Sequence, residues 1–205
     1  QGGHQLVGDR LLHHHIECSD PDSIEAAAKA VRAGMGDVQL VINTVGILHW
    51  DDKMPEKRVR ALDPEAALHA FAVNAVFPML LARYFEPLLC RDQSAVFASL
   101  SARVGSIEDN KLGGWYSYRA SKAAHNMYLR TLAREWAVSR RQTIVAALHP
   151  GTVASRLSAP FVSRNYSNRV LQPGECAEAL LKVIGALTVE DTGMFFDWQG
   201  LRIPW

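Results

Sequence analysis

The sequence GGWYSYRASKAAHN at residues 113–126 decides how the rest of the chain is interpreted. Its Tyr118 and Lys122 are four residues apart, so on an α-helix they project from the same face. The alanines around them favour that helix. A free tyrosine has a pKa of about 10, and a nearby ammonium group favours its ionised form. The pair could therefore move a proton at neutral pH, although an ordinary amphipathic helix would give the same pattern.

The composition indicates one globular domain covering residues 1–205. The 22 basic and 21 acidic residues are interspersed, which gives no electrostatic footprint for nucleic acid or an anionic membrane. Three widely separated cysteines without a C-x-x-C pattern suit a reducing compartment. No run reaches the length of a membrane-spanning helix, and no signal-peptide pattern opens the chain. We therefore expect a cytoplasmic protein with neither nucleic acid nor membrane as partner.

Strand-like and helix-like patterns alternate along the chain. The helix that carries Tyr118 should end near Val138, and the helix before it should bend near Pro78. Asp20 or Asp22 should cap the first helix. The alternation predicts an α/β fold, a doubly wound and mostly parallel sheet with helices on both faces. The expected strands are residues 11–17, 37–43 (covered on both faces), 94–102, 142–148 and 193–198, and the other helices are residues 23–32, 64–89 and 173–187.

Polar residues gather where the expected strands end. In a doubly wound sheet, ligands bind outside the carboxyl ends of the strands. Asn74 is unusual because it sits inside a helix, where asparagine is unfavourable. It is either a solvent-facing residue or a functional one. The residues that follow the strand ends are Glu17 and Cys18, residues 43–46, Ser99 and Ser101, and residues 150–155.

The three consecutive histidines at residues 13–15 do not predict a metal site. Neighbours on a strand point to opposite faces, so only His13 and His15 could share a ligand. A third ligand at suitable spacing is not evident. We therefore expect no metal. An α/β-hydrolase is also set aside, because the sequence has no G-x-S-x-G motif.

Five elements in order resemble the short-chain dehydrogenase/reductase family over nearly the whole chain. Residues 101–126 further resemble its carbonyl-reductase-like branch, which includes C-factor-type signalling proteins. The resemblance implies a Rossmann-like oxidoreductase that reduces a small-molecule carbonyl or oxidises a secondary alcohol with NADP or NAD. It also implies a homodimer or homotetramer. The elements are NTVG at residues 43–46, Asn74, Ser101, YRASK at residues 118–122, and Pro150 with Gly151.

The same resemblance implies roles for particular residues. Tyr118 would be the general acid or base, and Lys122 would lower its pKa and bind the nicotinamide ribose. Ser101 would hydrogen-bond the substrate oxygen, and Asn74 would hold a water behind Lys122. The implied cofactor-binding residues are Glu17, Cys18, Asn43, Thr44, Val45, Gly46, Lys122, Pro150, Gly151, Thr152 and Ser155.

Two features depart from the family pattern. The family serine lies three residues before the loop Gly105, and that position is Ala102, with Ser101 one place earlier and Ser106 and Ser99 as further candidates. The family also begins with a strand and a G-x-x-x-G-x-G turn that cradles the pyrophosphate, and this sequence shows neither. We therefore expect a further N-terminal segment of roughly 40 residues, without which neighbouring strands have unpaired edges.

The sequence also leaves a second function open and predicts places for the remaining aromatic residues. A catalytically weak binding or signalling protein of the C-factor type stays open, since fold does not settle function. Trp115, Tyr116 and residues 156–166 flank the site and could form a substrate lid. His149 should be structural, because no carboxylate partner is apparent for it. Trp198, Trp205, Phe195 and Phe196 should lie in the core or at a subunit interface.

Overall fold

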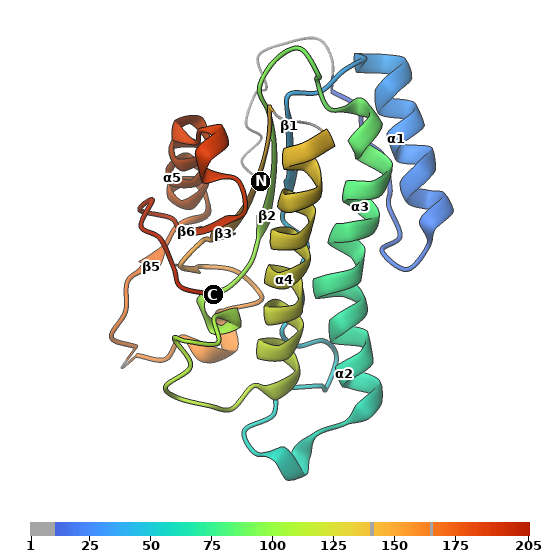
Figure 1. The fold of residues 1–205 in the computed structure, drawn as a ribbon. Coiled ribbons are helices and arrows are strands. Elements are labelled where there is room, and N and C mark those ends of the chain that lie inside the picture. Colours follow the sequence, from blue (N-terminus) through green and yellow to red (C-terminus); the bar gives the residue numbers. More distant parts are fainter. Residues whose placement is uncertain (1–10, 140–141, 165) are drawn as a thin grey trace.

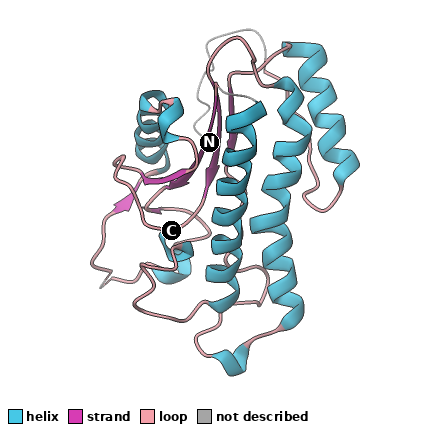
Figure 2. Cartoon of the chain, viewed as in Figure 1, coloured by secondary structure: helices cyan, strands magenta, loops and turns pink. Residues whose placement is uncertain are grey.

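The structure, a computed structural model, describes residues 11–139, 142–164 and 166–205. A parallel four-stranded sheet lies at its centre, in the order β1-β2-β3-β6 (Figures 1 and 2). The strands are β1 (Leu40–Asn43), β2 (Ala95–Leu100), β3 (Thr143–His149) and β6 (Met194–Asp197). Because every pairing in this sheet is parallel, all four carboxyl ends lie at one edge.

Helices cover both faces of the sheet, which confirms the predicted doubly wound α/β fold. Three helices lie on one face, and α5 lies on the other (Figure 1). The three are α1 (Pro21–Met35), α3 (Phe77–Phe85) and α4 (Tyr116–Ser139), and α5 spans Pro173–Ala186. Asp20 caps α1, as predicted, by accepting a hydrogen bond from the Asp22 backbone, and Gly36 ends the helix with a φ of 76°.

The long helix before β2 is interrupted at Asn74, not at Pro78. It consists of α2 (Pro64–Phe71), one π-helical turn η2 (Ala72–Val76), α3, and a final 3₁₀ turn η3 (Glu86–Leu88). Pro78 lies in the first turn of α3, where a missing N–H is tolerated. The π-helical turn places Asn74 inside the protein with no exposed surface, so the solvent-facing alternative for this residue is wrong.

By length and composition alone, the stretch Pro64–Leu88 could cross a membrane. The sequence-based expectation that no stretch meets this criterion is therefore wrong. Core helices pass the same test, and here Asn74 and Ala75 pack with no exposed surface. The stretch is weak evidence for a membrane partner, and the expected absence of one stays a prediction.

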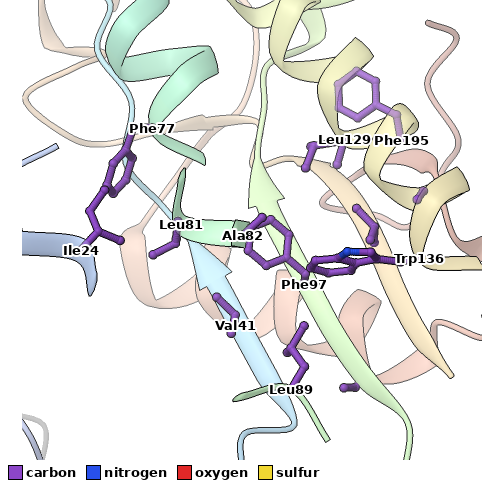
Figure 3. Close-up of a cluster of buried hydrophobic side chains, with 14 of the residues drawn as sticks. Ile24, Val41, Phe77, Leu81, Ala82, Leu89, Phe97, Leu129, Trp136 and Phe195 are labelled. Atoms are coloured by element: carbon purple, nitrogen blue, oxygen red, sulfur yellow. The ribbon is translucent and has the colours of Figure 1, made fainter. Parts of the chain in front are cut away.

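The alternation of side chains along the strands builds two apolar clusters, one on each face of the sheet. On the α4 side, the Trp136 ring meets Phe97 of β2 edge to face, with ring centroids 5.9 Å apart (Figure 3). On the other side, Leu148 and Phe196 pack against Leu180 and other residues of α5. Phe195 and Phe196 are therefore both core residues, on opposite faces.

Two strand predictions are wrong. Residues 11–17 form no strand, and no strand of the described chain pairs with their backbone groups. β1 is not covered on both faces: Val41 and Asn43 are buried, whereas Leu40 and Ile42 are more than a third exposed. Within the described residues, β1 pairs with β2 alone in this sheet. A small parallel pair, β4 (Thr152–Val153) with β5 (Val170–Leu171), was not predicted.

Candidate active site

A cavity of about 1180 Å³ opens at the edge of the sheet where the parallel strands end. This is the edge at which the sequence predicted ligand binding. Trp115, Arg119 and Phe161 contribute further walls. Of the predicted site residues, the cavity is lined by Thr44, Gly46, Ser101, Tyr118, Pro150, Gly151, Thr152 and Ser155.

Tyr118 and Lys122 lie in the first turns of α4, one turn apart, as their spacing predicted. Tyr118 faces the cavity, and Lys122 lies behind it, only 4% exposed. The Lys122 ammonium donates to the carbonyl of Leu100 at the end of β2, at 3.0 Å. A Cβ on Gly46 would lie 3.1 Å from the Lys122 nitrogen, so glycine lets the loop after β1 approach this group.

Burial sets the protonation of this pair in the free protein. It lowers the pKa of Lys122 to about 8, and it raises the pKa of Tyr118 above its ordinary value. Tyr118 is therefore a protonated phenol at neutral pH, the form that a general acid needs. The predicted lowering of the Tyr118 pKa is therefore wrong for the free protein, because burial dominates and raises this pKa.

Asn74 ties the loop after β1 to helix α4. Its side-chain amide donates to the Ile47 carbonyl at 2.9 Å and to the Ser121 hydroxyl at 3.0 Å. Its oxygen accepts from the Ile47 N–H at 2.8 Å. Ser121 in turn donates to the backbone carbonyl of Tyr118 at 3.0 Å. Asn74 thus holds the backbone beside Gly46, and its predicted role in holding a relay water stays a prediction.

Asn43 belongs to a buried chain of hydrogen-bonded polar side chains that runs from β1 through β2 to α4. Its amide donates to the Ser99 hydroxyl at 2.8 Å, and its oxygen accepts from the Val45 N–H at 3.1 Å. Ser99 meets Nε2 of His125 at 2.9 Å. Burial and the charge of Lys122 lower the pKa of His125 to about 3, so its ring is neutral. Asn43 and Val45 do not line the cavity.

The Ser101 hydroxyl lies at the cavity wall but points to α4. It donates to the Asn126 side chain at 2.6 Å, and Asn126 donates to the Gly105 carbonyl. Ala102, at the position of the family serine, also lines the cavity. Ser106 is buried and accepts from the Asp109 N–H. The role of Ser101 on the substrate oxygen therefore stays a prediction.

The loop after β3 forms the opposite side of the cavity. Gly151 has a φ of 75°, and a Cβ there would lie 2.9 Å from the Trp198 ring. Only glycine therefore fits this close approach. The Thr152 hydroxyl meets the Tyr166 hydroxyl at 2.7 Å, and the Ser155 hydroxyl donates to Ser158. These contacts hold part of the predicted lid beside the site.

The remaining predicted cofactor residues, Glu17 and Cys18, do not line the cavity. Glu17 is exposed, and its carboxylate accepts from the backbone and hydroxyl of Ser19. Cys18 packs against the apolar cluster on the α4 side of the sheet. The structure thus does not bring these two residues together with Tyr118.

His149, expected to be structural, lies at the end of β3 and lines the cavity. Burial and Arg103 lower the pKa of its ring to about 4, so the ring is neutral, and Nδ1 has no hydrogen-bond partner. Asp197 lies opposite it in register on β6. Asp197 instead pairs with Arg103, which also contacts Asp109. The pairing of β3 with β6 places Asp197 beside His149, and the local sequence around His149 could not show this.

Sequence reasoning missed Glu56, which anchors the start of α4. It is 8% exposed, and its carboxylate accepts from both the N–H and the hydroxyl of Ser117. Its backbone carbonyl accepts from the N–H of Trp115. Glu56 lies in a charged linker 61 residues before Ser117, and no local pattern marks the pairing.

The described residues contain no group of three or more His, Cys, Asp or Glu side chains placed to hold a metal ion. The histidines at residues 13–15 are exposed.

Comparisons with known proteins establish the family. The family model described as short chain dehydrogenase matches residues 3–165, and the chain therefore belongs to the short-chain dehydrogenase family of NAD(P)-dependent oxidoreductases. Among its relatives is the 1-hydroxy-2-glutathionyl-2-methyl-3-butene dehydrogenase of Rhodococcus sp., 30% identical over 190 residues. That match covers 93% of this chain and 78% of the relative. C-signal of Myxococcus xanthus is 29% identical over 178 residues, covering 87% and 99% of the two chains.

Solved structures show the same fold. The NADPH-bound carbonyl reductase from chicken fatty liver superposes with a TM-score of 0.80 at 28% identity, over 93% of this chain and 75% of that one. The carbonyl reductase Sniffer of D. melanogaster gives a TM-score of 0.80 at 23% identity, over 93% and 76%. The predicted family and the carbonyl-reductase-like fold are thus confirmed.

The buried Lys122 makes stability depend on pH. Its pKa is about 8 in the folded protein and has its ordinary value of 10.5 in the unfolded chain. Between these values the unfolded chain binds more protons, so the free energy of unfolding should rise with pH, by on the order of 3 kcal/mol. Lys122→Met removes the titrating group and should flatten the rise. Urea denaturation of both proteins between about pH 7 and pH 10.5 checks this, and parallel curves would contradict it.

Proposed function

We propose that this protein interconverts a carbonyl compound and its alcohol, with Tyr118 as the general acid and base. One observation carries the proposal: a buried phenol faces a large cavity at the ligand-binding edge of the sheet, one helical turn from a buried ammonium. The similarity to an NADPH-bound carbonyl reductase supports it.

The residues around Lys122 fit a nicotinamide cofactor. Gly46 lets the loop after β1 approach the ammonium, and Thr44 and Gly46 line the cavity beside it. Gly151 and Thr152 line the facing side. We therefore assign Lys122 to the ribose hydroxyls and the loop after β3 to the nicotinamide. The cofactor is NADP or NAD, and NADP is tested first because the similar carbonyl reductase from chicken fatty liver has NADPH bound.

When bound, the reduced cofactor supplies a hydride to the carbonyl carbon. Tyr118 donates its phenolic proton to the carbonyl oxygen, so the product is a neutral alcohol and the phenolate remains. Lys122 stabilises that phenolate through its positive charge. In the reverse direction, the phenolate removes the proton of the alcohol. Ser101 supplies the substrate oxygen with a hydrogen bond once it turns from Asn126.

The second candidate function is a binding or signalling role with little turnover. Two observations favour it: the similarity to C-signal over nearly the whole of that protein, and the Ser101 hydroxyl held by Asn126 with alanine at position 102. Nicotinamide emission that rises on binding, without oxidation across a panel of carbonyl compounds, would support this candidate and contradict the first.

The role of Tyr118 is tested by Tyr118→Phe in the full-length protein. The variant keeps the ring and loses the proton, so kcat for carbonyl reduction should fall by about 10² or more, the scale of general acid catalysis. The affinity for NADPH, measured by fluorescence titration, should stay within about twofold because the phenol is assigned to the substrate. A near-normal kcat would remove Tyr118 from the reaction.

We propose further that the protein is a homodimer or homotetramer and that it is cytoplasmic. Met127 and Tyr128 of α4, and Leu68 of the adjacent α2, are 65%, 45% and 72% exposed. Covering such apolar side chains would favour association. Met127→Glu should shift the protein toward the monomer in sedimentation experiments, because the added carboxylate would lie in the apolar contact. If the sedimentation mass of Met127→Glu equals that of the wild type, this face is excluded as the subunit interface.

A further inference from the structure

Three consecutive residues before α4 have a left-handed backbone. The φ angles are 64° at Gly113, 67° at Gly114 and 52° at Trp115. Glycine adopts such angles at no steric cost, but a bulky aromatic residue does so only where its surroundings enforce it. Backbone strain of this kind concentrates at ligand sites. The outlier is therefore Trp115, next to the helix that carries the reacting phenol.

Two residues hold this strained loop, Arg119 through its side chain and Glu56 through its backbone carbonyl. The Arg119 guanidinium donates to the carbonyls of Gly113 and Gly114, at 3.1 Å and 2.9 Å. The backbone carbonyl of Glu56 accepts from the Trp115 N–H, and the buried Glu56 carboxylate accepts from Ser117 at the start of α4. The conformation of Trp115 is thus fixed before any substrate arrives.

The held loop places the indole between the phenol and the predicted lid. The Trp115 ring lies edge to face with Tyr118, with centroids 6.1 Å apart, and 4.9 Å from the ring of Phe161. All three rings line the cavity. Trp115 and Phe161 are only half-buried, so they are not ordinary core residues. They form an aromatic wall beside the reacting hydroxyl.

Two of the charged side chains near this wall are already engaged. Arg119 is bound to backbone carbonyls, and Arg103 is paired with Asp109 and Asp197. Lys111 and Arg156 also line the cavity, but both are exposed to solvent. Next to Tyr118, the cavity therefore offers aromatic faces and edges, which favour a flat apolar group.

We propose that Trp115 is a specificity-determining residue, which selects carbonyl compounds whose carbonyl is attached to a flat, uncharged ring. The ring of the substrate packs on the wall formed by Trp115 and Phe161, and this contact directs its carbonyl oxygen to Tyr118. Glu56 and Arg119 are positioning residues that hold the indole. The assignment rests on the proposed carbonyl reduction.

The test compares benzaldehyde and propanal as substrates of the full-length protein with NADPH. Trp115→Gly removes the indole and leaves a residue that accepts the backbone angle without strain. The ratio of the two kcat/KM values, benzaldehyde over propanal, should fall about tenfold or more, mainly through KM for benzaldehyde. Trp115→Phe restores a ring and should recover most of the ratio. Thermal denaturation of each variant establishes that it is folded.

Two further variants sharpen the test. Phe161→Leu removes the other half of the wall and should lower the same ratio, which keeps the proposal testable where Trp115→Gly folds poorly. Tyr116→Ala is the matched control, because this neighbouring aromatic residue is exposed and does not line the cavity. Its ratio should equal that of the wild type.

The outcomes separate the two levels of inference. If the wild type reduces the aldehydes but Trp115→Gly and Phe161→Leu keep its ratio within about twofold, the specificity role is overturned and carbonyl reduction stands. If the wild type binds NADPH and reduces neither aldehyde nor any other carbonyl compound, the proposed function and the specificity role both fall. A ratio that drops in both wall variants, and not in Tyr116→Ala, supports the proposal.

Discussion

A row of buried hydrogen bonds between helix α4 and the end of β2 is the constraint on which the site depends. Ser101 bonds Asn126, Ser99 meets His125, and Lys122 donates to the end of β2. Breaking one of these contacts would leave a polar group unpaired in a low-dielectric interior, which is costly. These hydrogen bonds therefore fix the rotation of α4 about its own axis and its position along that axis. As a result, Tyr118 faces the cavity.

The same constraint explains the electrostatics of the site. The contacts require Lys122 to be buried, and burial lowers its pKa while raising that of Tyr118. The free protein thus holds a protonated phenol beside an ammonium whose only close partner in the described contacts is a backbone carbonyl. A phenolate formed by proton transfer to a substrate would be the missing counter-charge. The buried ammonium therefore stabilises the site more when Tyr118 is a phenolate, after proton transfer, than when it is a neutral phenol. Catalysis requires such a difference in stabilisation between the two states.

Local sequence predicted the parts of this arrangement that depend on spacing. The shared face of Tyr118 and Lys122, the order of strands and helices, and the collection of polar residues at the strand ends all follow from periodicity. Periodicity cannot show long-range partners, so Glu56 and the contact of Asp197 with Arg103 were not found. The π-helical turn at Asn74 arises from packing, not propensity. Residues 11–17 have strand-like composition, but a strand also needs a neighbour, and composition does not record one.

Transfer of a labelled hydride tests the central claim most directly. Full-length protein would be incubated with benzaldehyde and NADPH carrying deuterium at C4, in either stereochemical form, and the alcohol analysed by mass spectrometry. The account predicts deuterium on the carbinol carbon with one of the two labelled forms, and a strong loss of labelled product in Tyr118→Phe. Cofactor that binds, with enhanced emission, but transfers no deuterium from either form to any carbonyl compound would contradict it.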